Sequence, residues 1–224
     1  MLVTKDLTIR FGGHVAVDHV SCSFAPGTLT SIVGPNGAGK TTYFNLISGQ
    51  LPASEGTVLL GGEDITHLPA PLRTRRGLGR AFQLTQLFPN LSVHENVRLA
   101  IQAREAGRGK VGLDLWRVWS DHKAWLREAT QLLEQVNLAD KAQAAASSLP
   151  HGDQRKLEVA LLLALDPKVF MFDEPTAGMS VDEVPVVLDL IRSLKARKDI
   201  VILLVEHKMD VVRELSDRII VLHN

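Results

Sequence analysis

The chain has 224 residues, of which 45% are hydrophobic, and its 25 basic residues balance its 25 acidic residues to a formal net charge of zero. This length and composition allow a substantial buried core and favour one α/β domain that carries an insertion. The zero net charge removes the electrostatic argument for a nucleic-acid partner, so we expect none, although a local basic patch stays open.

Cysteine usage and the apolar runs bear on where the chain works. Cys22 is the single cysteine, which excludes an intramolecular disulfide and favours a reducing compartment. We expect its side chain to act as a small buried hydrophobic group. The first eleven residues mix charged and apolar side chains, so we expect no export signal. The longest apolar runs, 159–165 and 200–205, are far shorter than the roughly 18 to 20 residues that cross a bilayer. Any membrane contact is therefore expected through another protein.

The first half of the chain begins with short strands. Residues 29–33 form an apolar run that ends in a glycine-rich turn, and the helical pattern of 41–48 follows. Two more strands are expected at 57–60 and 78–82, the first closed by a turn at 61–64. The order strand, loop, helix is the context in which phosphate-binding loops occur.

The C-terminal third alternates strands with a helix. Residues 169–172 and 201–205 are apolar without polar alternation, which is typical of strands buried on both faces of a mainly parallel sheet. A helix between them is predicted by apolar residues at helical spacing: Val184, Val187, Leu188, Ile191 and Leu194. Strands that alternate with helices predict an α/β fold.

The middle of the chain differs, because it contains no convincing strand. A helix is predicted here by a further set of residues at helical spacing: Trp125, Ala129, Leu132, Leu133 and Val136. We predict a helical insertion at 84–148, with a loop at 106–111, and a core formed by 1–83 and 149–224. Trp116, Trp119 and Trp125 could form a partner-binding surface or pack internally, and packing is favoured.

The strongest motif is G-x-x-x-x-G-K-T, which lies between the predicted strand at 29–33 and the helix at 41–48. Its glycines let backbone N–H groups surround a triphosphate at a helix N-terminus. Lys40 would bridge the β- and γ-phosphates, and the Thr41 hydroxyl would bind Mg²⁺. A turn without a ligand is the alternative, which the flanking strand and helix disfavour. The predicted nucleotide-binding residues here are Gly34, Pro35, Asn36, Gly37, Ala38, Gly39, Lys40, Thr41 and Thr42.

Two adjacent carboxylates follow the buried strand at 169–172. Because ligands of open α/β sheets bind at the carboxyl ends of the strands, Asp173 is expected to hold Mg²⁺ and Glu174 to orient and deprotonate the attacking water. The alternative is an acidic pair that starts a helix ahead of Pro175. A phosphate loop by itself leaves kinases, GTPases and many ATPases open.

Further motifs, in this order, resemble the ATP-binding-cassette ATPases. Gln83 matches the family's Q-loop glutamine, which contacts Mg²⁺ and reports the nucleotide state. Leu-Pro-His-Gly-Asp-Gln-Arg at 149–155 occupies the signature position before a helix, and His207 matches the switch histidine. Phe11 matches the aromatic residue that stacks on adenine, with Val17 beside it, although a packing role for Phe11 is nearly as well supported.

The resemblance covers nearly the whole chain and implies a specific architecture and function. The fold would be a P-loop core with an N-terminal antiparallel β portion and an inserted α-helical subdomain. The activity would be hydrolysis of ATP with Mg²⁺ by a homodimer, or by a heterodimer with a similar subunit. Its partners would be transmembrane permease subunits, with the chain peripheral on the cytoplasmic side of the membrane.

The signature departs from the usual Leu-Ser-Gly-Gly-Gln. Pro150 offers neither a hydroxyl nor an N–H group, so binding of the partner's ATP would rest on His151, Gly152, Asp153 and the N-terminus of the following helix. Ser180 stands where the family commonly has Asp, which leaves a contact between subunits through this side chain in doubt.

Two interpretations of these departures are open. One is a disabled site that binds ATP without hydrolysing it. The other, which we favour, is the signature variant of importers of branched-chain and other hydrophobic amino acids or related amides. The same importer subfamily is also resembled by the segments at 77–83, 87–93 and 177–179.

A third alternative is an ATPase of this family without a permease, used in DNA repair or translation. Such proteins usually carry a second cassette, a coiled coil or a basic surface. The short basic run of Arg73, Arg75, Arg76 and Arg80 is interpreted as a solvated face. The chain stops at Asn224, where family members usually continue, which fits either a shortened chain or a minimal subunit.

Overall fold

The computed structural model describes residues 1–81, 87–108 and 123–223. They form two compact units. The first contains Met1–Arg80, Pro167–Glu174 and Arg192–Asn224, and the second contains Ala81–Asp166 and Pro175–Ile191. The insertion boundaries 84 and 148 stay a prediction. Among the helices of the described residues, none has both the length and the apolar character needed to cross a bilayer.

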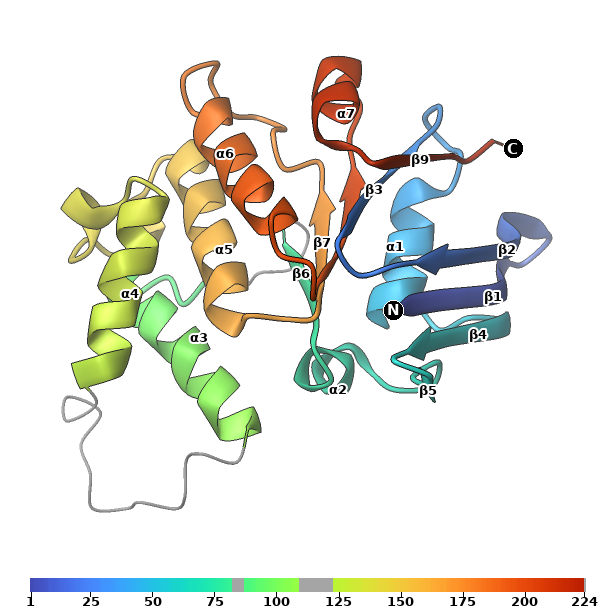
Figure 1. Cartoon of the computed structure of the whole chain (residues 1–224), viewed down its shortest axis with the longest axis horizontal. Helices are drawn as coiled ribbons and strands as arrows, with labels where there is room; N and C mark the ends of the chain where they lie inside the picture. The colour runs from blue at the N-terminus through green and yellow to red at the C-terminus, as the bar shows by residue number, and fades with distance from the viewer. Residues whose placement is uncertain (82–86, 109–122, 224) are drawn as a thin grey trace. The chain divides into compact units, whose positions relative to one another are not determined.

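A four-stranded antiparallel sheet opens the first unit, in the order β2-β1-β4-β5 (Figure 1). Its strands are β1 (Leu2–Phe11), β2 (His14–Phe24), β4 (Glu55–Leu60) and β5 (Glu63–Asp64). Gly61 and Gly62 both have positive φ and suffice for the tight turn between β4 and β5. The predicted turn at 61–64 is therefore wrong in its second half, where β5 pairs with β4.

The second sheet of this unit has five strands in the order β6-β7-β8-β3-β9. They are β3 (Thr28–Val33), β6 (Leu78–Ala81), β7 (Val169–Asp173), β8 (Val201–Val205) and β9 (Arg218–Val221). β8 lies parallel to β7 and β3, and β3 parallel to β9. Every residue of β7 and β8 is buried, which confirms the strands predicted from the two apolar runs.

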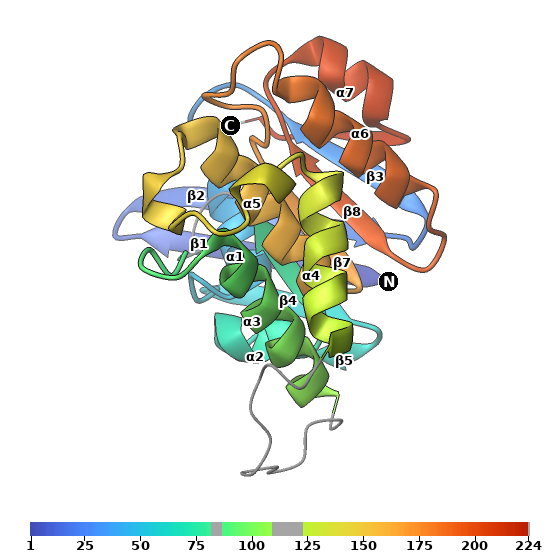
Figure 2. The same ribbon diagram turned by 90° about the vertical axis from the view of Figure 1, so that its left-hand side faces the viewer.

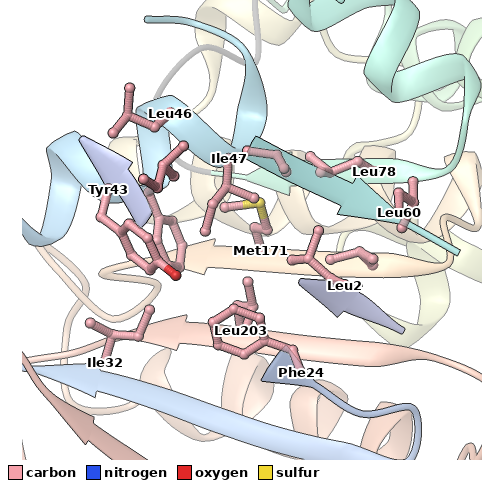
Figure 3. Packing of buried hydrophobic residues seen from close by; sticks show 14 of the residues in the cluster. Leu2, Phe24, Ile32, Tyr43, Leu46, Ile47, Leu60, Leu78, Met171 and Leu203 are labelled. Atoms are coloured by element: carbon pink, nitrogen blue, oxygen red, sulfur yellow. The ribbon is translucent and has the colours of Figure 1, made fainter. Parts of the chain in front are cut away.

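Helix α1 (Lys40–Ser48) joins the two sheets into one core (Figure 3). Tyr43 and Ile47 project from it among Leu2 of the antiparallel sheet and Met171 of the parallel sheet. The Tyr43 hydroxyl lies 2.7 Å from Oγ1 of Thr4, and burial raises the pKa of this phenol. The helix that begins at the phosphate loop is thus anchored on both sides.

The predicted solvated face holds for only half of the basic run: Arg75 and Arg76 are exposed, but the side chains of the other two arginines are buried, which corrects the prediction for them. Arg73, in α2 (Ala70–Arg75), is 2% exposed and donates hydrogen bonds of 2.7 Å to the carbonyl oxygens of Leu46 and Ile47 at the end of α1. The side chain of Arg80 is also buried. Both guanidinium groups find acceptors inside the unit, which lets a cation leave water.

The second unit is helical. Its main helices α3 (Val93–Gly107), α4 (Lys123–Gln135) and α5 (His151–Leu165) pack on one another (Figures 1 and 2). Short 3₁₀ turns at Ala139–Lys141 and Ala146–Ser148 lead into α5. Ala129 and Leu133 of α4 are fully buried, as their helical spacing predicts.

Two further helices complete the description. α6 (Val184–Lys195) buries the predicted apolar face, including Val187 and Ile191, and α7 (Met209–Leu215) precedes β9. Trp116 and Trp119 lie outside the described residues, so their two alternative roles stay predictions.

Candidate nucleotide-binding site

The phosphate loop at 34–39 connects β3 to α1 in the first unit. Gly39 has φ +80°, in the left-handed region that favours glycine. A Cβ atom at this residue would clash with the carbonyl oxygen of Ala16 and lie 3.3 Å from Cγ2 of Val17. The loop therefore needs glycine at this position both for its backbone conformation and for its close approach to β2.

The N-terminus of α1 has the features of an anion-binding helix end. Gly39 is its N-cap and offers no side-chain acceptor, and the first turn holds no acidic residue. Lys40 is buried, and its Nζ donates to the carbonyl oxygens of Gly34 (2.8 Å) and Pro35 (2.9 Å). Unsatisfied N–H groups and an ammonium group at one helix end together favour a phosphate.

The other residues of this unit that are predicted to contact the nucleotide differ in how far they are buried. Thr41 and Thr42 are half-buried in the first turn of α1. Phe11 ends β1 and is 50% exposed, so its ring is available to stack on a base, whereas Val17 is buried in β2. Gln83 lies outside the described residues, and its role stays a prediction.

The predicted catalytic carboxylate follows β7 directly. Glu174 has φ +52°, an uncommon conformation for a residue with a side chain, and its N–H donates to the carbonyl oxygen of Val205. Oε1 of Glu174 lies 2.8 Å from Nε2 of His207, and both side chains are partly exposed. The turn after β8 is fixed by Glu206, whose Oε2 accepts the N–H of His207 at 2.7 Å.

Asp173 precedes Glu174 but is buried in an ion pair. Its Oδ2 accepts a hydrogen bond of 2.7 Å from Nη2 of Arg80, and the two side chains are only 4% and 5% exposed. Burial lowers the pKa of the Arg80 guanidinium, and the bond to Asp173 opposes that shift. A carboxylate and the Thr41 hydroxyl are hard oxygen donors of the kind that bind Mg²⁺ together with substrate phosphates, so these residues fit the metal.

In the second unit, the signature segment enters helix α5. Pro150 is the N-cap and provides no side-chain hydrogen bond, while His151 is exposed and Gly152 is buried. Asp153 is also buried, and its carboxylate accepts hydrogen bonds from Lys141 and, at 2.9 Å, from Lys156. Burial would raise the pKa of Asp153, but the two lysines outweigh it and hold that pKa below its ordinary value.

A second carboxylate covers the signature glycine. A Cβ atom on Gly152 would overlap the carboxylate of Glu183. Oε2 of Glu183 accepts hydrogen bonds from the N–H (3.0 Å) and the hydroxyl (2.9 Å) of Ser180, which lower the pKa of Glu183. Ser180 therefore has a partner within its own segment.

Comparison with known proteins identifies the family. The ABC transporter family matches residues 17–177. The chain is 37% identical to the high-affinity branched-chain amino acid transport ATP-binding protein LivG of Escherichia coli K12, over 228 aligned positions that cover 100% of this chain and 88% of LivG. The chain belongs to the ABC transporter family. The cassette is also 36% identical to BraF of Pseudomonas aeruginosa, again over 100% of this chain and 88% of the relative.

Solved structures give the same result. A nucleotide-free ATP-binding cassette from an ABC transporter superposes with a TM-score of 0.80 and 30% identity, covering 99% of this chain and 87% of the other. The dimeric bacterial cassette MJ0796 superposes with a TM-score of 0.82 and 25% identity, covering 99% and 94%. The matches confirm the predicted family and α/β fold, and they make this cassette an ATPase.

The residues that contact the predicted site residues include several that the sequence analysis did not assign to the site, among them Arg80, Lys141 and Glu183. Glu183 had a signal, since Ser180 and a carboxylate three positions later form the S-x-x-E pattern of a helix start. Arg80 and Lys141 had none, because their partners are 93 and 12 positions away along the chain.

Proposed function

We propose that this cassette hydrolyses ATP to energise the uptake of branched-chain or other hydrophobic amino acids, or of related amides, through a membrane permease. The observation that carries the proposal is the joint presence, in one compact unit, of an uncapped helix at a phosphate loop and of Glu174 paired with His207. The variant signature and the full-length similarity to LivG and BraF, whose names specify branched-chain amino acid transport, support the solute class.

Nucleotide binding would use the first unit. The backbone N–H groups of the loop at 34–42, where only Pro35 has none to donate, and Lys40 would hold the phosphates, so Nζ of Lys40 would exchange its two carbonyl partners for phosphate oxygens. Phe11 would stack on adenine with Val17 beside it.

Hydrolysis would use the ends of β7 and β8. Thr41, Gln83 and Asp173 would hold Mg²⁺, which neutralises charge on the phosphates. Glu174 would orient and deprotonate the attacking water, and His207 would position Glu174 through the 2.8 Å contact between the two side chains.

Coupling to transport would need two cassettes. Two copies, or this chain and a similar subunit, would enclose each ATP between Lys40 of one and the segment His151, Gly152 and Asp153 of the other. A γ-phosphate bound from both sides favours the closed pair and can drive a permease, because a ligand shifts an equilibrium only toward the state that binds it more tightly. This arrangement implies a peripheral location on the cytoplasmic side of the membrane.

The decisive variant is Glu174→Gln. We expect ATP to bind as before, while steady-state phosphate release falls by about 10²- to 10⁴-fold, the usual contribution of a positioned base. Glu63→Gln, an exposed carboxylate paired with Arg76, is the matched control and should keep full activity. Unchanged turnover in Glu174→Gln would remove Glu174 from its role, and absent turnover in the parent protein would favour a cassette without hydrolysis.

The solute class has its own test. The cassette should co-purify with a membrane protein, and vesicles containing the complex should take up leucine in the presence of ATP. The Glu174→Gln complex, which would bind ATP without turnover, should not accumulate leucine. Uptake of a hydrophilic amino acid with exclusion of leucine would contradict the proposed solute.

A further inference from the structure

Arg80 links three elements around the carboxylate that follows β7. Its Nη2 donates to Oδ2 of Asp173 at 2.7 Å, and its Nη1 donates to Oδ1 of Asn45 (2.7 Å) and Oγ of Ser48 (3.0 Å). The guanidinium also lies 5.5 Å from the ring centroid of Phe44. Arg80 itself belongs to β6, whereas Phe44, Asn45 and Ser48 all belong to α1.

Stability alone is a weak reason for such a pair. Removing a carboxylate and a guanidinium from water costs about as much as their attraction returns, so a buried ion pair is often neutral compared with an apolar one. The contacts of Arg80 do restrict geometry, because a planar guanidinium has N–H groups in fixed directions. Two of these directions are fixed by α1 and one by Asp173.

The consequence is an indirect link between Thr41 and Asp173, two of the three predicted metal ligands. α1 carries Thr41 in its first turn, and Asn45 and Ser48 lie one and two turns further along the same helix. Because Arg80 bonds both this helix and Asp173, the position of the carboxylate is set relative to Thr41. Arg80 occupies Oδ2, and among the described residues no other group bonds this carboxylate, so Oδ1 is available to a ligand.

We propose that Arg80 is a positioning residue that holds the Asp173 carboxylate against helix α1 in the orientation that receives Mg²⁺ with ATP. The inference rests on the proposed role of Asp173 as a metal ligand. Partners that orient a metal ligand typically change metal affinity by about 10- to 100-fold when they are removed. The contribution of Mg²⁺ to ATP affinity should therefore depend on Arg80.

The test measures binding rather than turnover. In the Glu174→Gln background, the dissociation constant of ATP is measured with Mg²⁺ and again with EDTA. The constant in EDTA divided by the constant with Mg²⁺ gives the contribution of the metal to ATP affinity. We expect Arg80→Met to reduce this ratio by about 10- to 100-fold and to change the EDTA constant little. Arg80→Lys, which keeps the charge but lacks the planar fork, should recover only part of the ratio.

Two variants separate positioning from stability. Arg73→Met removes another buried arginine that contacts the same helix, but Arg73 donates its hydrogen bonds to backbone carbonyl oxygens and does not bond Asp173. This variant should unfold more easily and keep the full ratio. If Arg80→Met does not fold, Asn45→Ala removes one contact of the guanidinium and should still lower the ratio.

Asp173→Asn tells the two hypotheses apart. If it abolishes the effect of Mg²⁺ while the Arg80 and Asn45 variants keep the full ratio, the inference about Arg80 is wrong and the proposed site stands. If Asp173→Asn itself keeps the ratio, Asp173 is not a metal ligand and the proposed site fails with it. A reduced ratio in Arg73→Met as large as in Arg80→Met would also overturn the inference, because the effect would then be one of general stability.

Discussion

The phosphate loop and the signature segment both lie at the start of a helix, but different parts of the chain stabilise them. In the phosphate loop, local features set much of the conformation, through the left-handed φ of Gly39 and the bonds from Lys40 to the carbonyl oxygens of Gly34 and Pro35, although Gly39 also approaches the distant strand β2 closely. In the signature segment, Asp153 depends on Lys141 and Gly152 is covered by Glu183. A backbone-determined loop tolerates few substitutions, whereas contacts from distant side chains can be exchanged one at a time.

The largest effect is expected at Gly39. Gly39→Ala should lower the free energy of unfolding by about 3 kcal/mol and abolish ATP binding, because alanine is strained at φ +80° and its Cβ would clash with backbone. Gly37→Ala is the matched control, since φ is +86° there but nothing lies within 4 Å of the added atom. Gly37→Ala should lower the free energy of unfolding, measured with urea, by only about 1 kcal/mol. Equal losses in the two variants would show that close packing of the loop is unimportant.

A smaller effect is expected at Asp153. Asp153→Asn should lower the free energy of unfolding by about 1–2 kcal/mol at pH 7, since it weakens charged hydrogen bonds from Lys141 and Lys156. The pKa of Asp153 is lowered in the folded state, so its stabilisation is full above the ordinary pKa of about 3.9 and is lost as the pH falls through the folded-state value.

Urea unfolding at pH 7, 4 and 3 checks this prediction. The difference between the parent and Asp153→Asn should narrow as the pH falls below about 4. The exposed neighbour Asp140, changed to Asn, serves as the control. A difference that stays constant down to pH 3 would contradict the ion-pair explanation.

The smallest effect is expected at Gly152. Gly152→Ala should change the free energy of unfolding by less than about 1 kcal/mol, because the flexible end of Glu183 can move away and alanine is the better helix former. In the Glu183→Ala background the same change should stabilise the protein by about 0.5–1 kcal/mol. The double-mutant cycle measures this coupling, and strict additivity would show that Glu183 does not pack on the glycine.

Local patterns predicted much of the fold. The apolar runs that form β7 and β8 are buried along their whole length, and the helical spacing at Ala129 and Leu133 corresponds to the buried face of α4. The phosphate loop was predicted at the correct junction of β3 and α1, because its glycines and Lys40 act on neighbouring backbone. The family followed from the order of motifs, although the roles of individual site residues stay predictions.

The basic run shows where such patterns fail. Arg73 and Arg80 were interpreted as solvated from their neighbours in the sequence, but both are buried. Arg73 has local acceptors in the carbonyl oxygens of Thr66 and Leu68, but its acceptors in α1 and the acceptors of Arg80 in α1 and β7 are 26 or more positions away. A run of charged residues predicts exposed side chains only when no hydrogen-bond acceptor from elsewhere in the chain binds them.

The sequence by itself determined the α/β class, the phosphate loop and the paired acidic residues after a buried strand, because each depends on residues within about one turn or one strand of one another. Only the tertiary structure decided that Arg80 holds Asp173 against α1 and that Glu183 covers Gly152. Those contacts join segments separated by 93 and 31 positions, and their geometry exists only after the sheets and helices have packed.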